Sequence, residues 1–285
     1  MNNQEGKVPN IDIDRVIADK SEKAAGLIPG FVKAYIKRIV HQDEINAFME
    51  QAGNLRGWEF ANAVLKRLSV TYSISYTDRA KIKEHGRYIF VSNHPLGGLD
   101  GLALISAFGA GNNIKFVVND FLMYITPLSD IFVPVNKVGA MGKNYAESFN
   151  RAYESERDIL YFPAGLCSRL IKGRIEDLEW KSSFVKQALR YNREIVPIYF
   201  SGKNSLFFYR LAKLRKFVGI KFNIEMLFLP DEMFKQTDSH FNIIVGEPIT
   251  IEEIRKLSEM EDGTRNLKRC ASKIKEIAYS LKRGK

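Results

Sequence analysis

The chain of 285 residues carries 43 Lys and Arg against 33 Asp and Glu, which gives a net charge of +10. With 45% hydrophobic and 27% charged residues, it has the composition of an ordinary globular protein that is long enough to bury a substantial core. The two cysteines, Cys167 and Cys270, exclude a disulfide framework and fit a reducing compartment. The positive charge favours an anionic partner, whether nucleic acid, an anionic membrane surface or an acidic carrier protein.

The sequence also argues against export and against membrane insertion. The N-terminus is polar and carries acidic residues early, so we expect no signal peptide. No window of about 18 apolar residues occurs, so we expect no membrane span. These features predict a cytoplasmic protein, which would reach any lipid substrate from the membrane surface.

The first 69 residues are predicted to be helical. After a frayed start over residues 1–10, helices are expected at Asp14–Lys23, Phe31–Gln51 and Trp58–Leu68. The second of these has an apolar stripe and a basic side. Such a helix can pack on a core or lie in a bilayer interface, and the sequence leaves both possibilities open.

From residue 70 onward, short apolar runs alternate with helical segments, which is typical of a mainly parallel sheet flanked by helices. The expected strands are Val70–Tyr76, Tyr88–Val91, Lys115–Asn119, Ile131–Val135, Asp158–Phe162, Glu194–Phe200, Asn223–Leu229 and Phe241–Val245. The expected helices are Leu102–Phe108, Tyr145–Ser155, Trp180–Tyr191 and a basic C-terminal helix at Arg265–Lys282. We therefore predict an α/β fold: a mainly parallel mixed sheet flanked by helices over residues 70–285, after an N-terminal helical region over residues 1–69.

A candidate site lies where the second strand ends, in residues 91–101, Val-Ser-Asn-His-Pro-Leu-Gly-Gly-Leu-Asp-Gly. Ligands of open α/β sheets bind beyond the carboxyl ends of the strands. Residues six apart lie about 240° apart on a helix, so His94 and Asp100 meet only in an irregular turn, which Pro95, Gly97 and Gly98 favour. The carboxylate would then fix the tautomer of His94 and raise its basicity toward a bound hydroxyl. Alternatively, Asp100 caps the helix and the backbone holds His94.

This stretch resembles the histidine–aspartate signature of the glycerolipid acyltransferase family, whose founding members acylate glycerol 3-phosphate or its 1-acyl derivative. The family usually places four residues between the two, and this chain has five. Three further stretches match the family's other blocks in order, so the resemblance covers about residues 85–205. It implies that His94 takes a proton from an acceptor hydroxyl, that Asp100 orients His94, and that the oxygen attacks an acyl thioester directly. Asn93, Gly97 and Gly98 would then line the substrate site.

The second block falls at Asp130–Lys137. Asn136 and Lys137 stand where phosphate-acceptor members of the family usually carry an arginine. A lysine can still neutralise an acidic acceptor, although without the bidentate fork of arginine. A solvated lysine at a strand end is an equally good interpretation. The fourth block, Ile195–Gly202, is also explained by a buried strand alone.

The third block is represented by residues 161–169, Tyr-Phe-Pro-Ala-Gly-Leu-Cys-Ser-Arg, where glycerol-phosphate enzymes have Phe-Pro-Glu-Gly-Thr-Arg-Ser. An alanine, Ala164, replaces the acceptor-holding glutamate, and a site that loses such polar groups predicts a changed acceptor. Arg169 or Lys172 would supply the lost positive charge. Cys167 is interpreted as an inert buried thiol rather than an acyl-cysteine nucleophile. The other residues assigned here to substrate binding are Pro163, Gly165 and Ser168.

A segment of mixed aromatic and basic character follows the fourth block. Residues 203–217 interleave aromatic side chains with five cations. Aromatic rings with long cationic side chains suit an interfacial helix on a membrane. The same residue types form stacking platforms for single-stranded nucleic acid, so the segment alone is ambiguous.

Together these features predict an O-acyltransferase of membrane lipid biosynthesis, with acyl carrier protein or coenzyme A as the thioester donor and with no metal or other cofactor. The changed third block is similar to the hemolysin-like branch, which acylates lyso-aminolipids such as lyso-ornithine or N-acyl-glycine lipids, so an N-acyl amino acid is the expected acceptor. The alternatives are a lysophosphatidate acyltransferase and a non-catalytic lipid-binding module. We expect a peripheral protein on the inner face of the cytoplasmic membrane, and no nucleic-acid partner.

Overall fold

The computed structural model describes residues 10–20, 26–83, 86–135 and 142–283. Seven strands of this part of the chain form one sheet in the order β1-β9-β8-β2-β5-β3-β4. Their bounds are β1 Thr71–Tyr76, β2 Ile89–Ser92, β3 Ile114–Val118, β4 Phe132–Pro134, β5 Asp158–Tyr161, β8 Ile195–Phe200 and β9 His240–Val245. Only β8 and β9 pair antiparallel among these neighbours. The predicted mainly parallel mixed sheet is therefore confirmed.

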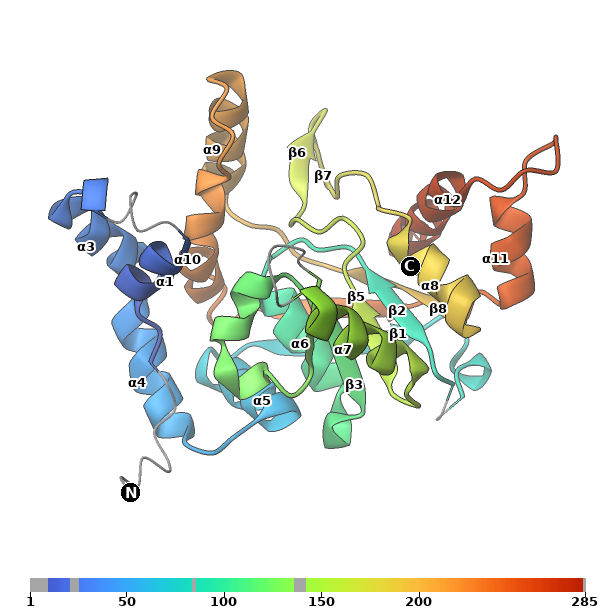
Figure 1. Ribbon diagram of the computed structural model, residues 1–285, viewed down its shortest axis with the longest axis horizontal. Helices are drawn as coiled ribbons and strands as arrows, with labels where there is room; N and C mark the ends of the chain where they lie inside the picture. The colour runs from blue at the N-terminus through green and yellow to red at the C-terminus, as the bar shows by residue number, and fades with distance from the viewer. Residues whose placement is uncertain (1–9, 21–25, 84–85, 136–141, 284–285) are drawn as a thin grey trace.

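Helices cover both faces of the sheet (Figure 1). They are α1 Ile13–Lys20, α3 Gly30–Ile39, α4 Gln42–Ala52, α5 Gly57–Arg67, α6 Leu99–Phe108, α7 Gly142–Glu154, α8 Ser183–Tyr191, α9 Leu206–Phe217, α10 Leu229–Phe234, α11 Ile251–Ser258 and α12 Leu267–Ser280. None of the helices in the described ranges combines the length and the apolar character needed to cross a bilayer.

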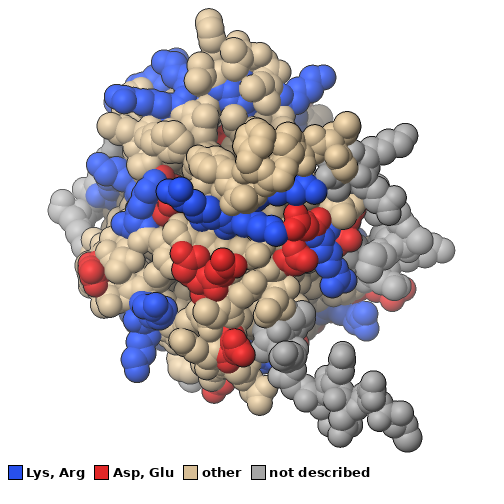
Figure 2. Space-filling model, turned by 90° about the vertical axis from the view of Figure 1, so that its left-hand side faces the viewer, with Lys and Arg blue, Asp and Glu red and all other residues tan. Residues whose placement is uncertain are grey.

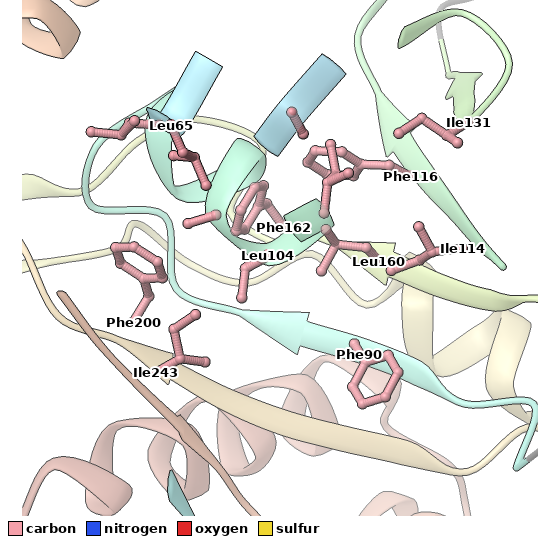
Figure 3. Packing of buried hydrophobic residues seen from close by; sticks show 14 of the residues in the cluster. Leu65, Phe90, Leu104, Ile114, Phe116, Ile131, Leu160, Phe162, Phe200 and Ile243 are labelled. Carbon is pink, nitrogen blue, oxygen red and sulfur yellow. The ribbon is translucent and has the colours of Figure 1, made fainter. Parts of the chain in front are cut away.

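Alternate residues of the central strand β2 face opposite sides of the sheet, and both faces are buried, which is why the strand is apolar as far as Val91. Phe90 packs with α5 and α6 in one buried cluster, which also holds Leu104 and Phe162 (Figure 3). Ile89 and Val91 belong to a second cluster on the other face, beneath α7, α8, α11 and α12. Burial on both faces fixes β2 firmly, so the loop that follows it starts from a rigid point.

The expected helix Phe31–Gln51 is wrong, because the chain forms two helices, α3 and α4, with a break at His41. His41 has a left-handed backbone with φ of 52°. Its imidazole stacks on Phe234 at 4.2 Å between ring centroids and lies 3.3 Å from a carboxylate oxygen of Asp231. These contacts with α10 are distant in sequence, so the local apolar period gave no sign of the break.

The expected strand Asn223–Leu229 is also wrong. The chain forms a 3₁₀ helix, η5, at Ile224–Phe228 and then α10. Pro230 lies in the first turn of α10, a position that suits proline because the N–H of that turn needs no intrahelical partner. Glu225 is fully buried and forms ion pairs with Arg169 and Arg215.

A hairpin that the sequence analysis missed projects from the sheet, with β6 at Arg169–Ile171 and β7 at Arg174–Glu176. Its two central residues, Lys172 and Gly173, have φ of 46° and 80°. Positive φ at both positions is the geometry of a type I′ turn. The hairpin rises beside α9 at the same end of the molecule (Figure 1).

Candidate active site

The loop that carries His94 is anchored to the sheet by Asn93. The Asn93 side-chain amide donates to the Phe200 carbonyl oxygen at 2.9 Å, and its oxygen accepts from the Phe200 N–H at 2.7 Å. Asn93 is 3% exposed. In the structure, this predicted substrate-binding residue thus ties the loop after β2 to the end of β8.

His94 and Asp100 are in contact, as the motif predicted, with His94 Nδ1 3.0 Å from Asp100 Oδ2. The same oxygen accepts the N–H of Leu96 at 2.8 Å and of Gly97 at 3.4 Å, while Oδ1 accepts the N–H of Gly101 at 2.8 Å. These main-chain bonds fold the turn back over the carboxylate, and they require a residue with φ of 90° at Gly97. The turn geometry accommodates the five intervening residues.

This arrangement sets the chemistry of the imidazole. An ionised carboxylate only accepts hydrogen bonds, so Nδ1 of His94 carries the proton and Nε2 keeps its lone pair. The ring stacks on Phe162 of the third block at 4.0 Å between centroids, and 13% of the side chain is exposed. Asp100 is fully buried, so solvent reaches the histidine and not its partner. The pair has the geometry of a general base with an orienting acid.

A second buried carboxylate, Asp177, supports the loop from the other side. Its Oδ1 accepts the N–H of His94 at 3.1 Å and the hydroxyl of Ser168 at 2.6 Å, and its Oδ2 accepts the indole N–H of Trp180 at 2.8 Å. Burial raises the pKa of the Asp177 carboxyl, and these hydrogen bonds act in the opposite direction. The N–H of Ser168 also donates to the His94 carbonyl oxygen at 2.7 Å. Asp177 thereby locks the first block to the third.

The C-terminal helix α12 holds the main chain of Asp177. The N–H of Asp177 donates to the Tyr279 hydroxyl at 2.7 Å, and Lys275 Nζ donates to the Asp177 carbonyl oxygen at 2.6 Å. Sequence analysis missed Asp177 because it lies 83 residues from His94 in an ordinary acidic stretch. No local signal could have found it.

The third block follows β5, so it lies at the same edge of the sheet as His94. The residue at the family's glutamate position, Ala164, is 4% exposed and packs in the apolar cluster under the sheet. Pro163 and Gly165 shape this turn, in which Gly165 has φ of 68° and donates its N–H to the Phe162 carbonyl oxygen. Cys167 is fully buried, and burial raises its pKa to about 11. A neutral, enclosed thiol agrees with the prediction of an inert cysteine.

Arg169 does not present a free charge. Its Nη2 donates to Glu225 Oε1 at 2.9 Å, and its Nη1 donates to the Cys167 carbonyl oxygen at 2.6 Å. Arg215 Nε lies 2.8 Å from the other oxygen of Glu225, so two guanidinium groups share one buried carboxylate. Lys172 is exposed at the tip of the hairpin. Neither cation therefore stands beside His94 as an open acceptor site.

The remaining predicted residues are accounted for as follows. Gly98 immediately precedes α6 and is exposed at the turn. Gly97 has no room for a side chain, because an added Cβ would lie 2.7 Å from methyl carbons of Leu229. Asn136 and Lys137 lie outside the described residues.

Comparison with known proteins adds the following findings. The model of a family described as Acyltransferase matches residues 15–279. The lyso-glycine lipid O-acyltransferase of Phocaeicola vulgatus is 39% identical over 273 residues, which cover 95% of this chain and 95% of that protein. That of Bacteroides thetaiotaomicron is also 39% identical, over 95% of this chain and 97% of the relative. A crystal structure of the 1-acyl-sn-glycerophosphate acyltransferase PlsC from Thermotoga maritima is similar at a TM-score of 0.43 and 15% identity, over 79% and 82% of the two chains.

Proposed function

The chain belongs to the acyltransferase family, and on that premise we propose that it moves a fatty acyl group from an acyl thioester to the hydroxyl of a lyso-aminolipid. The observation that carries this proposal is the contact between Nδ1 of the partly exposed His94 and the buried Asp100, which leaves Nε2 as the proton acceptor. The relatives named as lyso-glycine lipid O-acyltransferases support an N-acyl amino acid as the acceptor.

In the proposed mechanism, His94 Nε2 removes the proton of the acceptor hydroxyl while Asp100 stabilises the imidazolium that forms. The oxygen attacks the thioester carbonyl, and the new C–O bond is followed by cleavage of the C–S bond. The imidazolium returns its proton to the departing thiolate. The buried Cys167, with its pKa of about 11, supplies no thiolate near neutral pH, which favours direct transfer over an acyl-cysteine intermediate.

The oxyanion of the tetrahedral intermediate needs N–H donors that are not already bonded. The N–H groups of Leu96, Gly97 and Gly101 donate to Asp100, and that of Gly165 donates to a carbonyl oxygen. Gly98 stands at the N-terminus of α6, where the first N–H groups lack intrahelical partners. We propose that the donor comes from this first turn of α6, where Gly98 is the exposed residue.

The acceptor is tested by offering a labelled long-chain acyl carrier protein thioester with lysophosphatidate and an N-(3-hydroxyacyl) glycine side by side. Product on the glycine lipid is expected, since the acceptor glutamate is replaced by the core residue Ala164 and the charge of Arg169 is already paired. Product only on lysophosphatidate would refute the proposed acceptor. The same assay with the coenzyme A thioester in place of the acyl carrier protein thioester identifies the donor, since either thioester is proposed.

His94→Ala distinguishes an enzyme from a lipid-binding module. Loss of the general base is expected to lower the transfer rate about 10²- to 10⁴-fold, with lipid binding retained. The matched control is His240→Ala, because His240 is exposed on β9 and bonds only Thr71 and Ser73 among the contacts found in the described chain. Equal activity of His94→Ala and the wild type would refute the catalytic role.

We also propose that the protein works as a peripheral enzyme on the cytoplasmic side of an anionic membrane. Its net charge of +10 and its lipid acceptor support this location. The surface that would meet the bilayer is considered next.

A further inference from the structure

The outer side of α9 and the segment after it expose a concentration of large apolar side chains. Seven of the thirteen such side chains exposed in the described residues fall within residues 206–222. Scattered apolar residues on a surface need no explanation, but a continuous group of this size marks an interaction site. We call this group the α9 surface, and its exposed fractions are Leu206 60%, Phe207 49%, Leu214 58%, Phe217 87%, Val218 59%, Ile220 43% and Phe222 63%.

Apart from Phe207, whose ring meets that of Phe228 edge-on at 5.1 Å between centroids, these side chains lie away from the face that holds α9 on the protein. The inner face of the helix carries Phe208, Tyr209 and Ala212, all buried, and the first two pack against Cys167. The exposed members Leu206, Leu214 and Phe217 recur at spacings that place them on the opposite face. A surface helix normally presents polar residues there, whereas the outer face of α9 carries large apolar side chains as well as Arg210 and Lys213.

The exposed charged side chains within residues 205–222 are all cations. Residues 205–222 contain no Asp or Glu, and Arg210, Lys213, Lys216 and Lys221 are exposed among the apolar side chains. In the side view of Figure 2, Lys and Arg side chains lie on both flanks of the uncharged top of the molecule. Apolar side chains bordered by long cationic ones match a bilayer with anionic lipids, because the cations can reach the headgroups while the apolar groups enter the acyl region.

The α9 surface is also placed next to the candidate active site. β8 runs parallel to β2, so α9 leaves the same edge of the sheet as the loop of His94. The Glu225 carboxylate, held between Arg215 of α9 and Arg169, fixes the helix to the residue that follows Ser168. A bilayer against α9 would therefore lie close to the catalytic edge.

We propose that α9 lies on the surface of an anionic bilayer, with the α9 surface in the interface and its four exposed cations at the headgroups. The inference deepens the proposed function by naming the surface through which the enzyme reaches a lipid acceptor. It differs from contact through α3, which exposes Phe31 and Tyr35.

The test is sedimentation of the purified full chain with vesicles of equal phosphatidylcholine and phosphatidylglycerol, and with vesicles of phosphatidylcholine alone. The double variant Leu214→Ser with Phe217→Ser is expected to bind the mixed vesicles at least about tenfold more weakly than the wild type, because it removes two large apolar groups from the interface. Leu178→Ser is the matched control, because Leu178 is 37% exposed but lies outside the α9 surface. It is expected to bind as the wild type does.

A second pair of substitutions tests the charges. Lys213→Glu with Lys216→Glu should weaken binding to the mixed vesicles and change binding to phosphatidylcholine vesicles much less. Thermal unfolding should be nearly unchanged in all variants, because each replaced side chain is exposed.

Three results would overturn the proposal. The first is wild-type binding by both α9 variants. The second is loss of binding confined to Phe31→Ser with Tyr35→Ser, which would assign the contact to α3. The third is a change of oligomeric state in the α9 variants with vesicle binding intact, which would make the surface an interface between copies of the chain. Binding is measured without donor or acceptor, so failure of the proposed acyl transfer would leave this result standing, and the reverse also holds.

Discussion

Asp177 ties the loop of His94, 83 residues earlier in the chain, to Ser168 and Trp180, which lie nine and three residues away from it. Its two carboxylate oxygens hold the N–H of His94, the hydroxyl of Ser168 and the indole of Trp180. All three groups are donors, and the carboxylate is 1% exposed. A side chain at this position must therefore be an acceptor at both of its oxygens, and only an ionised carboxylate of this length meets that need.

We expect Asp177→Asn to lower the rate of acyl transfer about tenfold or more. The NH₂ group of the asparagine would replace one of the two acceptor oxygens and would face a hydrogen-bond donor, so the loop of His94 would shift. The effect should appear in kcat more than in KM for the acceptor, since Asp177 touches the main chain of His94. Measurement of both constants at matched folded fraction checks this, with the exposed Glu179→Gln as control. Equal kcat in Asp177→Asn and the wild type would contradict a positioning role.

At the scale of elements, the strands and turns that depend on residues close together in the sequence were predicted correctly. The strands of the sheet were recognisable because β2 and β8 are buried on both faces, so that β8 is continuously apolar and β2 is apolar as far as Val91. The contact of His94 with Asp100 was predictable because glycine and proline lie between them. The errors came from distant partners: His41 breaks a helix to pack on Phe234, and Glu225 is surrounded by arginines that no pattern near residue 225 reveals.

The attachment of α9 depends on that buried glutamate. Glu225→Gln would leave Arg169 and Arg215, whose side chains are 12% and 15% exposed, facing each other without a counter-charge. Breaking a buried ion pair in this way typically costs about 3 kcal/mol, so a clear fall in the free energy of unfolding is expected. Urea unfolding with far-UV detection measures it, and Glu261→Gln is the control because Glu261 is exposed. A loss no larger than that of the control would show that the ion pairs contribute little.

At the scale of the whole molecule, several groups that ionise in alkali are enclosed in the core. Burial raises the pKa of Cys167 to about 11 and that of Tyr209 to about 12, and it raises the pKa values of Tyr153 and Tyr279 as well. Below about pH 8 these groups are almost wholly neutral in both the folded and the unfolded chain and have little effect on stability. At higher pH, these groups lose their protons in the unfolded chain before they do so in the folded chain.

Stability should consequently fall as the pH rises from about 8 through the folded-state pKa values. Cys167 alone, with its pKa raised from 9.0 to about 11, accounts for up to about 3 kcal/mol of this loss once it ionises. Urea unfolding at about pH 8 and about pH 11 measures the fall. Cys167→Ala is expected to be less stable at the lower pH and to lose less on going to the higher one. A fall as large as that of the wild type would assign the effect to the tyrosines.

The hydrogen bonds around Asp177 also determine when the folding chain gains catalytic activity. Tyr279, which holds the Asp177 main chain, lies 102 residues beyond it, and Asp177 lies 83 residues beyond His94. Contacts across such separations close late, after the local helices and the neighbouring strands have formed. Because synthesis releases the N-terminal part first, a growing chain can pair His94 with Asp100 long before α12 exists to brace them. Activity is therefore expected to be among the last properties gained in folding, and it should disappear as soon as α12 detaches.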